Sequence, residues 1–175
     1  MIVTLVGLMG SGKSTVARAL AARWPGFGAL DLDARIEARA GRTIAEIFAA
    51  DGEPGFRALE AEVLSDVLLH EDRLVLATGG GAPCQPGAMD ALLGAGPVVW
   101  LDAPPEALVA RALTATRPLL AGRSPDDATR VLAVQLAARG PHYARATLRV
   151  DAGQPLEEVV SAIDRGLGTL VGVAE

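Results

Sequence analysis

At 175 residues, half of them apolar, the chain is long enough for one domain with a full hydrophobic core, which excludes a disordered protein. Its net charge of −5 argues against nucleic acid as the main partner, and no apolar run reaches the length of a membrane span. The single Cys84 cannot form an internal disulfide, and no basic leader precedes the first predicted strand, so we expect a cytoplasmic protein.

The predicted elements alternate between strand and helix along the whole chain. Five buried strands are expected, at residues 2–6, 29–32, 73–77, 97–101 and 147–150. Helical segments are expected between and after them, at about 13–24, 43–50, 54–70 and 156–167. Parallel strands joined by helical crossovers predict a doubly wound α/β domain, in which ligands bind beyond the carboxyl ends of the strands.

Residues 7–15, Gly-Leu-Met-Gly-Ser-Gly-Lys-Ser-Thr, fit the phosphate-binding loop G-x-x-x-x-G-K-[S/T]. In such a loop backbone N–H groups close around phosphate oxygens, Lys13 reaches the outer phosphates and Ser14 can ligate Mg²⁺. A glycine-rich turn that binds nothing is the alternative, but the strand, loop and helix all agree with the motif. The sequence contains fifteen arginines and a single lysine, Lys13. The compact ammonium group of lysine therefore occurs only at the position where this loop requires it.

Asp31 and Asp33 end the second predicted strand, and an extended backbone would turn both carboxylates to the same side. We assign Asp31 to the support of Mg²⁺, and Asp33 to hold an acceptor hydroxyl and accept its proton. Asp33 could instead cap the helix that follows it. Asp102, at the end of the fourth strand, competes for the metal, although we favour a helix cap for it because two prolines follow at once.

Three arginines and a triple glycine complete the candidate residues. Gly79-Gly80-Gly81 directly follows the third strand, which indicates either close approach to a ligand or a tight turn. Arg57 could offer its planar fork to a substrate carboxylate, or pair with Glu60 on the helix surface. Arg117 begins a predicted mobile flap and could reach the phosphates, and Arg139 could bind the acceptor or complement the end of its own helix.

Taken together, these separated motifs resemble those of the shikimate kinases from one end of the chain to the other. They are residues 7–15, Asp31-Leu32-Asp33 with Ile36-Glu37, residues 47–53 with Phe56-Arg57, residues 79–81, residues 117–120, and Arg139 before Pro141-His142-Tyr143. The resemblance implies Mg²⁺-dependent transfer of the ATP γ-phosphate to the 3-hydroxyl of shikimate, on a sheet of strand order 2-3-1-4-5. Another small-molecule kinase of the same fold, for instance one acting on gluconate, is the closest alternative.

The resemblance also implies a role for each candidate residue, with Lys13, Asp33 and Arg117 as the catalytic group. The ATP-binding residues would be Gly10, Ser11, Gly12, Lys13, Ser14, Thr15, Arg117 and Gln154, the last against adenine. Shikimate would contact Asp33, Arg57, Gly79, Gly80, Gly81 and Arg139, and the metal would lie at Ser14 and Asp31. We expect one kinase domain over residues 1–175, with a lid at about 112–127 and a substrate-binding helical segment at about 33–62. Shikimate and ATP are the expected partners of a monomer, without nucleic acid or membrane.

Overall fold

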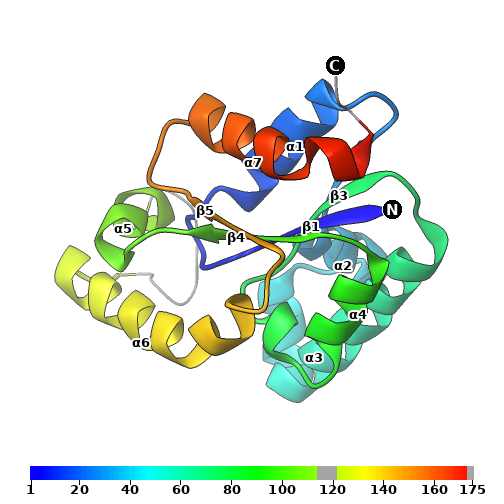
Figure 1. Cartoon of the computed structure of the whole chain (residues 1–175). Coiled ribbons are helices and arrows are strands. Elements are labelled where there is room, and N and C mark those ends of the chain that lie inside the picture. The colour runs from blue at the N-terminus through cyan, green and yellow to red at the C-terminus, as the bar shows by residue number, and fades with distance from the viewer. Residues whose placement is uncertain (114–121, 173–175) are drawn as a thin grey trace.

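The computed structural model describes residues 1–113 and 122–172, and in that part of the chain five strands form one sheet (Figure 1). The strands are β1 (Ile2–Val6), β2 (Gly28–Asp31), β3 (Leu74–Ala77), β4 (Val98–Asp102) and β5 (Leu148–Asp151). They lie in the order β2-β3-β1-β4-β5, and each neighbouring pair is parallel. The predicted doubly wound α/β class and strand order are confirmed, and every strand end lies within a residue of its expected place.

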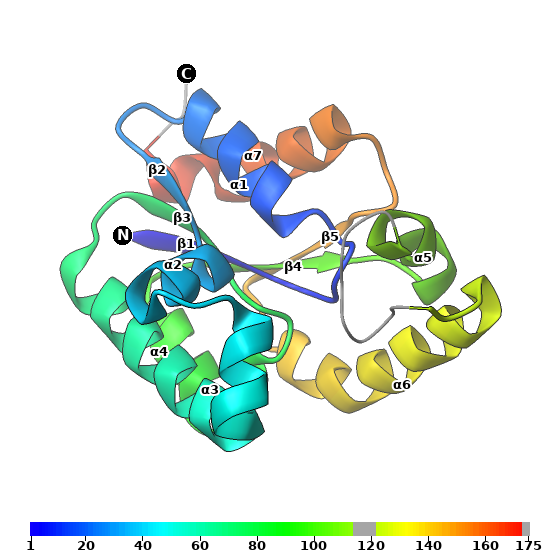
Figure 2. The same cartoon turned by 180° about the vertical axis from the view of Figure 1, so that it is seen from behind.

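Helices cover both faces of the sheet, as crossovers between parallel strands require. Over one face lie α1 (Lys13–Arg23) and α7 (Leu156–Val171), as Figures 1 and 2 show from opposite sides. The other face carries α3 (Ile44–His70), α4 (Ala88–Ala95) and α6 (Pro125–Tyr143). The remaining helical elements are α2 (Leu32–Ala40), the 3₁₀ turn η1 (Ala82–Cys84) and α5 (Pro105–Leu113). Within the described ranges, no helix combines the length and apolarity needed to cross a lipid bilayer.

The centre of the sheet is apolar on both faces. Every residue of β1 and β3 is buried, and Val3, Leu5 and Val75 are completely shielded from solvent. Parallel strands that are covered on both sides appear in the sequence as continuous apolar runs, which explains why these strands were clear from the sequence. The well-packed centre fixes the carboxyl ends of β1 and β3, where the phosphate-binding loop and the triple glycine begin.

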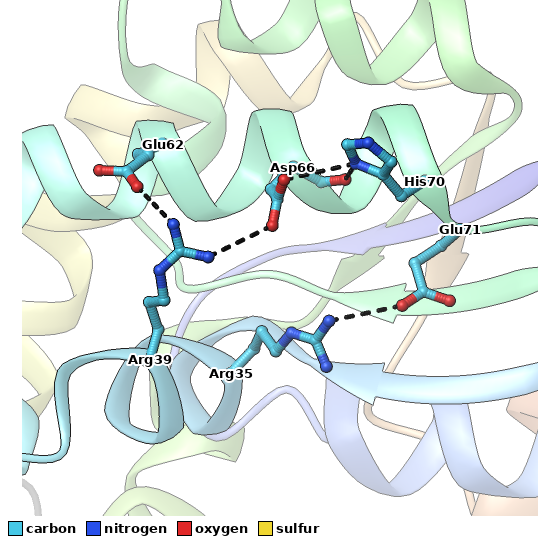
Figure 3. Close-up of polar contacts among 6 residues, drawn as sticks. All are labelled: Arg35, Arg39, Glu62, Asp66, His70 and Glu71. Carbon is cyan, nitrogen blue, oxygen red and sulfur yellow. Dashed lines mark hydrogen bonds and ion pairs between the residues drawn. The ribbon is translucent and has the colours of Figure 1, made fainter.

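Exposed ion pairs join α2 to α3 and to the residue that follows α3. Figure 3 shows Arg39 reaching Glu62 at 2.8 Å and Asp66 at 3.5 Å, and Arg35 reaching Glu71 at 3.6 Å. Each such surface pair contributes roughly 0–1 kcal/mol, because solvent screens the charges. The buried apolar side of α2, with Leu32 and Ile36, is therefore the larger contribution to holding α2 in place.

α3 is interrupted at Gly52, where the backbone leaves the helical region with φ 68° and ψ −176°. Thr43 caps the first half of the helix through reciprocal hydrogen bonds with Glu46. The two helical segments predicted from the sequence correspond to the two halves of α3. Phe48 of the first half stacks on Phe56 of the second half, with 4.6 Å between the ring centroids. Ile44 and Phe48 of the first half line the cavity described below.

Candidate active site

A cavity of about 580 Å³ opens beyond the carboxyl ends of β1, β2 and β3. Its lining includes most of the phosphate-binding loop, all three glycines 79–81, and the side chains of Asp31, Asp33, Arg57 and Arg139. A second cavity of about 600 Å³, between α3 and α4, is lined mainly by alanine, leucine and glycine. Converging charged groups and backbone N–H groups mark the first cavity as the candidate active site, although the second has a similar volume.

The phosphate-binding loop has the backbone that an anion cradle requires. Gly7 has φ 141°, and a methyl group there would lie 2.5 Å from the carbonyl oxygen of Leu101, so only glycine fits. Gly12 caps α1 in the left-handed conformation, and the amino end of α1 therefore faces the cavity. Lys13 Nζ donates to the carbonyl oxygens of Gly7 and Leu8, each at 2.9 Å. The Lys13 ammonium group therefore lies against the backbone of its own loop, inside the candidate phosphate site.

Asp31 is joined to both the phosphate-binding loop and α2. The Ser14 hydroxyl donates to Asp31 Oδ2, and Asp31 Oδ1 accepts from the N–H groups of Asp33 at 3.0 Å and Ala34 at 3.4 Å. The assumed extended backbone through residue 33 was wrong, because the chain turns helical at Leu32 and Asp31 is the cap of α2. The interpretation of Asp33 as the cap is wrong for the same reason. Hydroxyl and carboxylate oxygens in contact, inside the cavity, are suitable ligands for Mg²⁺.

Asp102 lies outside the lining of this cavity. Its carboxylate accepts a hydrogen bond from Arg149 Nε at 3.0 Å, and the Arg149 guanidinium also lies over the ring of Trp100. The prediction that Asp102 caps the next helix is wrong, because α5 begins only at Pro105. Of the two aspartates considered for the metal, Asp31 is therefore the one beside Ser14.

Each of the three glycines leaves room for one side chain of the site. A methyl group on the first glycine would lie 2.8 Å from Asp33 Oδ1, and one on the second would lie 2.9 Å from Arg139 Nη1. On the third, it would lie 2.6 Å from Arg57 Nη2. The row of glycines therefore brings together three side chains from α2, α3 and α6, which are far apart in the sequence.

Arg57 and Glu60 form the predicted ion pair, at 2.7 Å, but it lies in the wall of the cavity instead of on the helix surface. Glu60 is only 2% exposed, and its Oε1 atom has no hydrogen-bond partner among the described residues. Burial raises the pKa of Glu60, and the neighbouring Arg57 offsets this only in part. Burial lowers the pKa of Arg57, but the bonds to Glu60 and Glu53 more than compensate and raise it. The raised pKa of Arg57 means that its guanidinium stays charged. The raised pKa of Glu60 means that its carboxylate takes up a proton at a higher pH than an ordinary glutamate.

The structure places the other candidate residues less centrally. Ser11, within the phosphate-binding loop, is buried and does not line the cavity. Gln154 is exposed, and its side-chain amide donates to Asp151 at 2.8 Å, away from the cavity lining. Arg111 of α5 has no role in the assignments above, but it lines the cavity and donates to the carbonyl oxygen of Ala152 at 2.8 Å. Arg117 lies outside the described residues.

Two residues of the site were not identified from the sequence. Glu60 was considered only as a surface partner of Arg57, although its spacing of three residues on a helix was the available signal. Tyr143 received no role, yet its hydroxyl donates to the carbonyl oxygen of Gly80. The sequence offered the four-residue spacing between Arg139 and Tyr143, which places both on one side of α6.

Comparison with known proteins agrees with the geometry. The family model described as shikimate kinase matches residues 9–166. A shikimate kinase of Symbiobacterium thermophilum is 50% identical over 149 residues, which cover 83% of either chain. The crystal structure of a shikimate kinase from Bacteroides thetaiotaomicron superposes with a TM-score of 0.90 at 32% identity, covering 96% of this chain and 98% of that one. A shikimate kinase from Acinetobacter baumannii in complex with shikimate gives a TM-score of 0.79 at 35% identity, covering 99% and 95%.

Proposed function

The chain belongs to the shikimate kinase family, and from that premise we propose which of its residues perform the transfer. Its function is that of a shikimate kinase, an ATP-dependent phosphotransferase that phosphorylates the 3-hydroxyl of shikimate and releases ADP. Membership of this family excludes the alternative of a kinase that acts on gluconate. The observation that carries the residue assignment is the convergence of Asp33, Arg57 and Arg139 on the three glycines 79–81.

Shikimate is proposed to lie against those glycines. Arg57 and Arg139 bind its carboxylate, because two guanidinium forks supply the paired donors that a carboxylate accepts. Asp33 holds the 3-hydroxyl and accepts its proton as the phosphoryl group is transferred. The N–H groups of the glycines face the remaining hydroxyls. The solved structure of a related shikimate kinase with a TM-score of 0.79 is a complex with shikimate, which supports an acceptor site in this fold.

The phosphates of ATP are proposed to lie in the loop of residues 10–15. Lys13 leaves the carbonyl oxygens of Gly7 and Leu8 and binds the outer phosphates, as its position inside the cradle allows. Ser14 and Asp31 would hold Mg²⁺, directly or through water, and the ion would supply positive charge that offsets the charge of the phosphates. Adenine lies towards residues 151–155, with Gln154 as the proposed contact.

We propose that the whole chain is a single kinase domain, which includes an acceptor-binding segment and a lid. Residues of about 33–62 form the acceptor-binding segment, supported by the positions of Asp33, Arg57 and Glu60 in the cavity wall. Residues of about 112–127 form the lid, with Arg117 on the phosphates. We also propose that the protein is a monomer. A cytoplasmic location is proposed because one cysteine and an ATP requirement both suit that compartment.

Replacing Arg57 by lysine tests the acceptor site. We expect the KM for shikimate to rise by about 10-fold or more and the KM for ATP to stay unchanged, because lysine keeps the charge and loses the two-pronged fork. Steady-state kinetics with either substrate varied would measure both constants. The matched control is Arg39→Lys, an exposed arginine on α2 whose change should alter neither constant. If the Arg57→Lys enzyme had an unaltered KM for shikimate, Arg57 would have only a structural role, as the ion-pair partner of Glu60.

The raised pKa of Glu60 predicts an acid-side loss of acceptor binding. A carboxyl group with a raised pKa is charged above that pKa and becomes neutral as the pH falls through it, so Arg57 loses its charged partner at a higher pH than it would beside an ordinary glutamate. We expect the KM for shikimate to increase as the pH is lowered from 8 to about 5. In Glu60→Gln, which cannot titrate, the same pH range should change the KM less. Equal pH profiles for the two enzymes would show that Glu60 is not the titrating group.

A further inference from the structure

Tyr143 is the only tyrosine of the chain and the last residue of α6. Its side chain is completely buried, and its ring lies 5.9 Å from that of Trp100. The hydroxyl donates to the carbonyl oxygen of Gly80. Burial raises the pKa of Tyr143 to about 12, so the hydroxyl keeps its proton and remains a donor at any pH at which the enzyme is assayed.

The carbonyl group of each of the three glycines accepts a hydrogen bond from a residue further along the chain. The Gly79 carbonyl accepts from the Ala82 N–H at 3.2 Å, and the Gly81 carbonyl accepts from the Cys84 N–H at 3.1 Å. Both donors lie within η1, three residues further along. The carbonyl of Gly80 is different, because its donor Tyr143 comes from a helix 63 residues away in the sequence.

The N–H groups of the same glycines are left for a ligand. Within residues 1–113 and 122–172, no backbone or side-chain acceptor takes a hydrogen bond from the N–H of Gly79, Gly80 or Gly81. In a trans peptide the C=O of one residue and the N–H of the next point in opposite directions. A hydroxyl that holds the Gly80 carbonyl on the α6 side therefore also holds the Gly81 N–H on the opposite side.

Tyr143 also interacts with one of the two proposed carboxylate-binding arginines. Arg139 lies four residues earlier on α6, one helical turn away and on the same side of the helix. Its Nη1 atom lies 2.9 Å, and the Tyr143 hydroxyl oxygen 3.6 Å, from where a methyl group on Gly80 would be. The Tyr143 hydroxyl thus bonds the backbone of Gly80 and lies close to the Arg139 guanidinium.

We propose that Tyr143 is a positioning residue for shikimate, whose hydroxyl fixes both the Gly80–Gly81 peptide and the Arg139 guanidinium in the orientation that receives the acceptor. The inference rests on the proposed function, in which these groups bind shikimate. Tyr143 touches no reacting atom, so its effect falls on acceptor binding and not on the transfer step. A tyrosine that only filled space between α6 and β4 would need its ring alone, and phenylalanine would replace it.

The first test is Tyr143→Phe, which keeps the ring against Trp100 and removes only the hydroxyl. We expect the KM for shikimate to rise about five- to tenfold, with kcat and the KM for ATP within about twofold of wild type, as loss of one positioning hydrogen bond predicts. The control is Trp24→Phe, which removes another buried aromatic donor, bonded to Asp164 at 2.6 Å on the α1–α7 side of the sheet. The control should lower the thermal stability and leave the KM for shikimate unchanged.

Because the chain has one tyrosine, 3-fluorotyrosine gives a single ¹⁹F resonance and leaves the core intact. We expect this resonance to shift when shikimate is added to the labelled enzyme without nucleotide. No shift, or a Tyr143→Phe enzyme with a wild-type KM, would overturn the inference. Arg139→Lys separates this from the proposed function: if it too leaves the KM for shikimate unchanged, the acceptor site itself is misplaced. If it raises the KM while Tyr143→Phe does not, only the role of Tyr143 is lost.

Discussion

Replacing Asp33 by asparagine is expected to lower kcat by about 10²- to 10⁴-fold, the usual contribution of a positioned general base. Asparagine has almost the same shape and still bonds an acceptor hydroxyl, but it cannot take the proton. The backbone N–H of Asp33 donates to Asp31 and is unaffected, so Asp31 keeps its bond to Ser14 and the metal site is retained. A coupled assay of ADP release would measure kcat, and calorimetric titration would show ATP binding unchanged.

Asp66→Asn is the matched control for Asp33→Asn, because Asp66 is half-buried on α3 and its ion pairs within the described residues, with Arg39 and His70, lie outside the cavity (Figure 3). It should turn over at the wild-type rate. A value of kcat for Asp33→Asn within a few-fold of wild type would remove Asp33 from the proton transfer. Lost ATP affinity would instead show that the substitution had disturbed α2 and the Asp31 cap.

Gly81→Ala is expected to raise the KM for shikimate by about 10- to 100-fold with little change in stability. The Gly81 backbone has φ −93° and ψ −17°, which alanine adopts freely, so the backbone does not require glycine here. The added methyl group would lie 2.6 to 3.0 Å from three atoms of the Arg57 guanidinium. The fork must move, and loss of its charged hydrogen bonds to a carboxylate accounts for the expected change. The free energy of unfolding should stay within about 1 kcal/mol, because a flexible side-chain end moves and the backbone does not.

Gly94→Ala serves as the control for Gly81→Ala, because a methyl group on that residue of α4 meets nothing within 4 Å. It should stabilise the helix by about 0.5–1 kcal/mol without altering either KM. Urea unfolding and steady-state kinetics on both variants would separate the two effects. Should Gly81→Ala bind shikimate normally, or unfold far more easily than wild type, the glycine would serve the backbone and not Arg57.

The sequence predicted the sheet and the edge that carries the site because both depend on patterns within short segments. Continuous apolar runs marked β1, β3 and β4, and the phosphate-binding loop sets the strand-to-helix transition at Gly12. Crossover topology then brings the carboxyl ends of the strands together. The prediction that Asp31, Asp33 and the three glycines share one site followed from that rule, and the cavity lining agrees with it.

Three features of the site could not be predicted from such patterns. The helical turn at Leu32 depends on the Asp31 carboxylate bonding two N–H groups, which competes with an extended strand end of the same sequence. Burial of Glu60 depends on how α3 packs against the glycines, and helix periodicity alone placed it on the surface. The bond from Tyr143 to Gly80 joins segments 63 residues apart, so only the tertiary structure shows it.

The row of glycines also limits how this protein can diverge. Because the space beside Gly81 is filled by the Arg57 guanidinium, the two positions share one volume and are not independent under selection. In a descendant that no longer binds a carboxylate, Arg57 could be replaced by a residue with a shorter side chain. Gly81 could then be replaced by a larger residue. As long as an acid remains the acceptor, neither position can change alone, and we expect the pair to be inherited together.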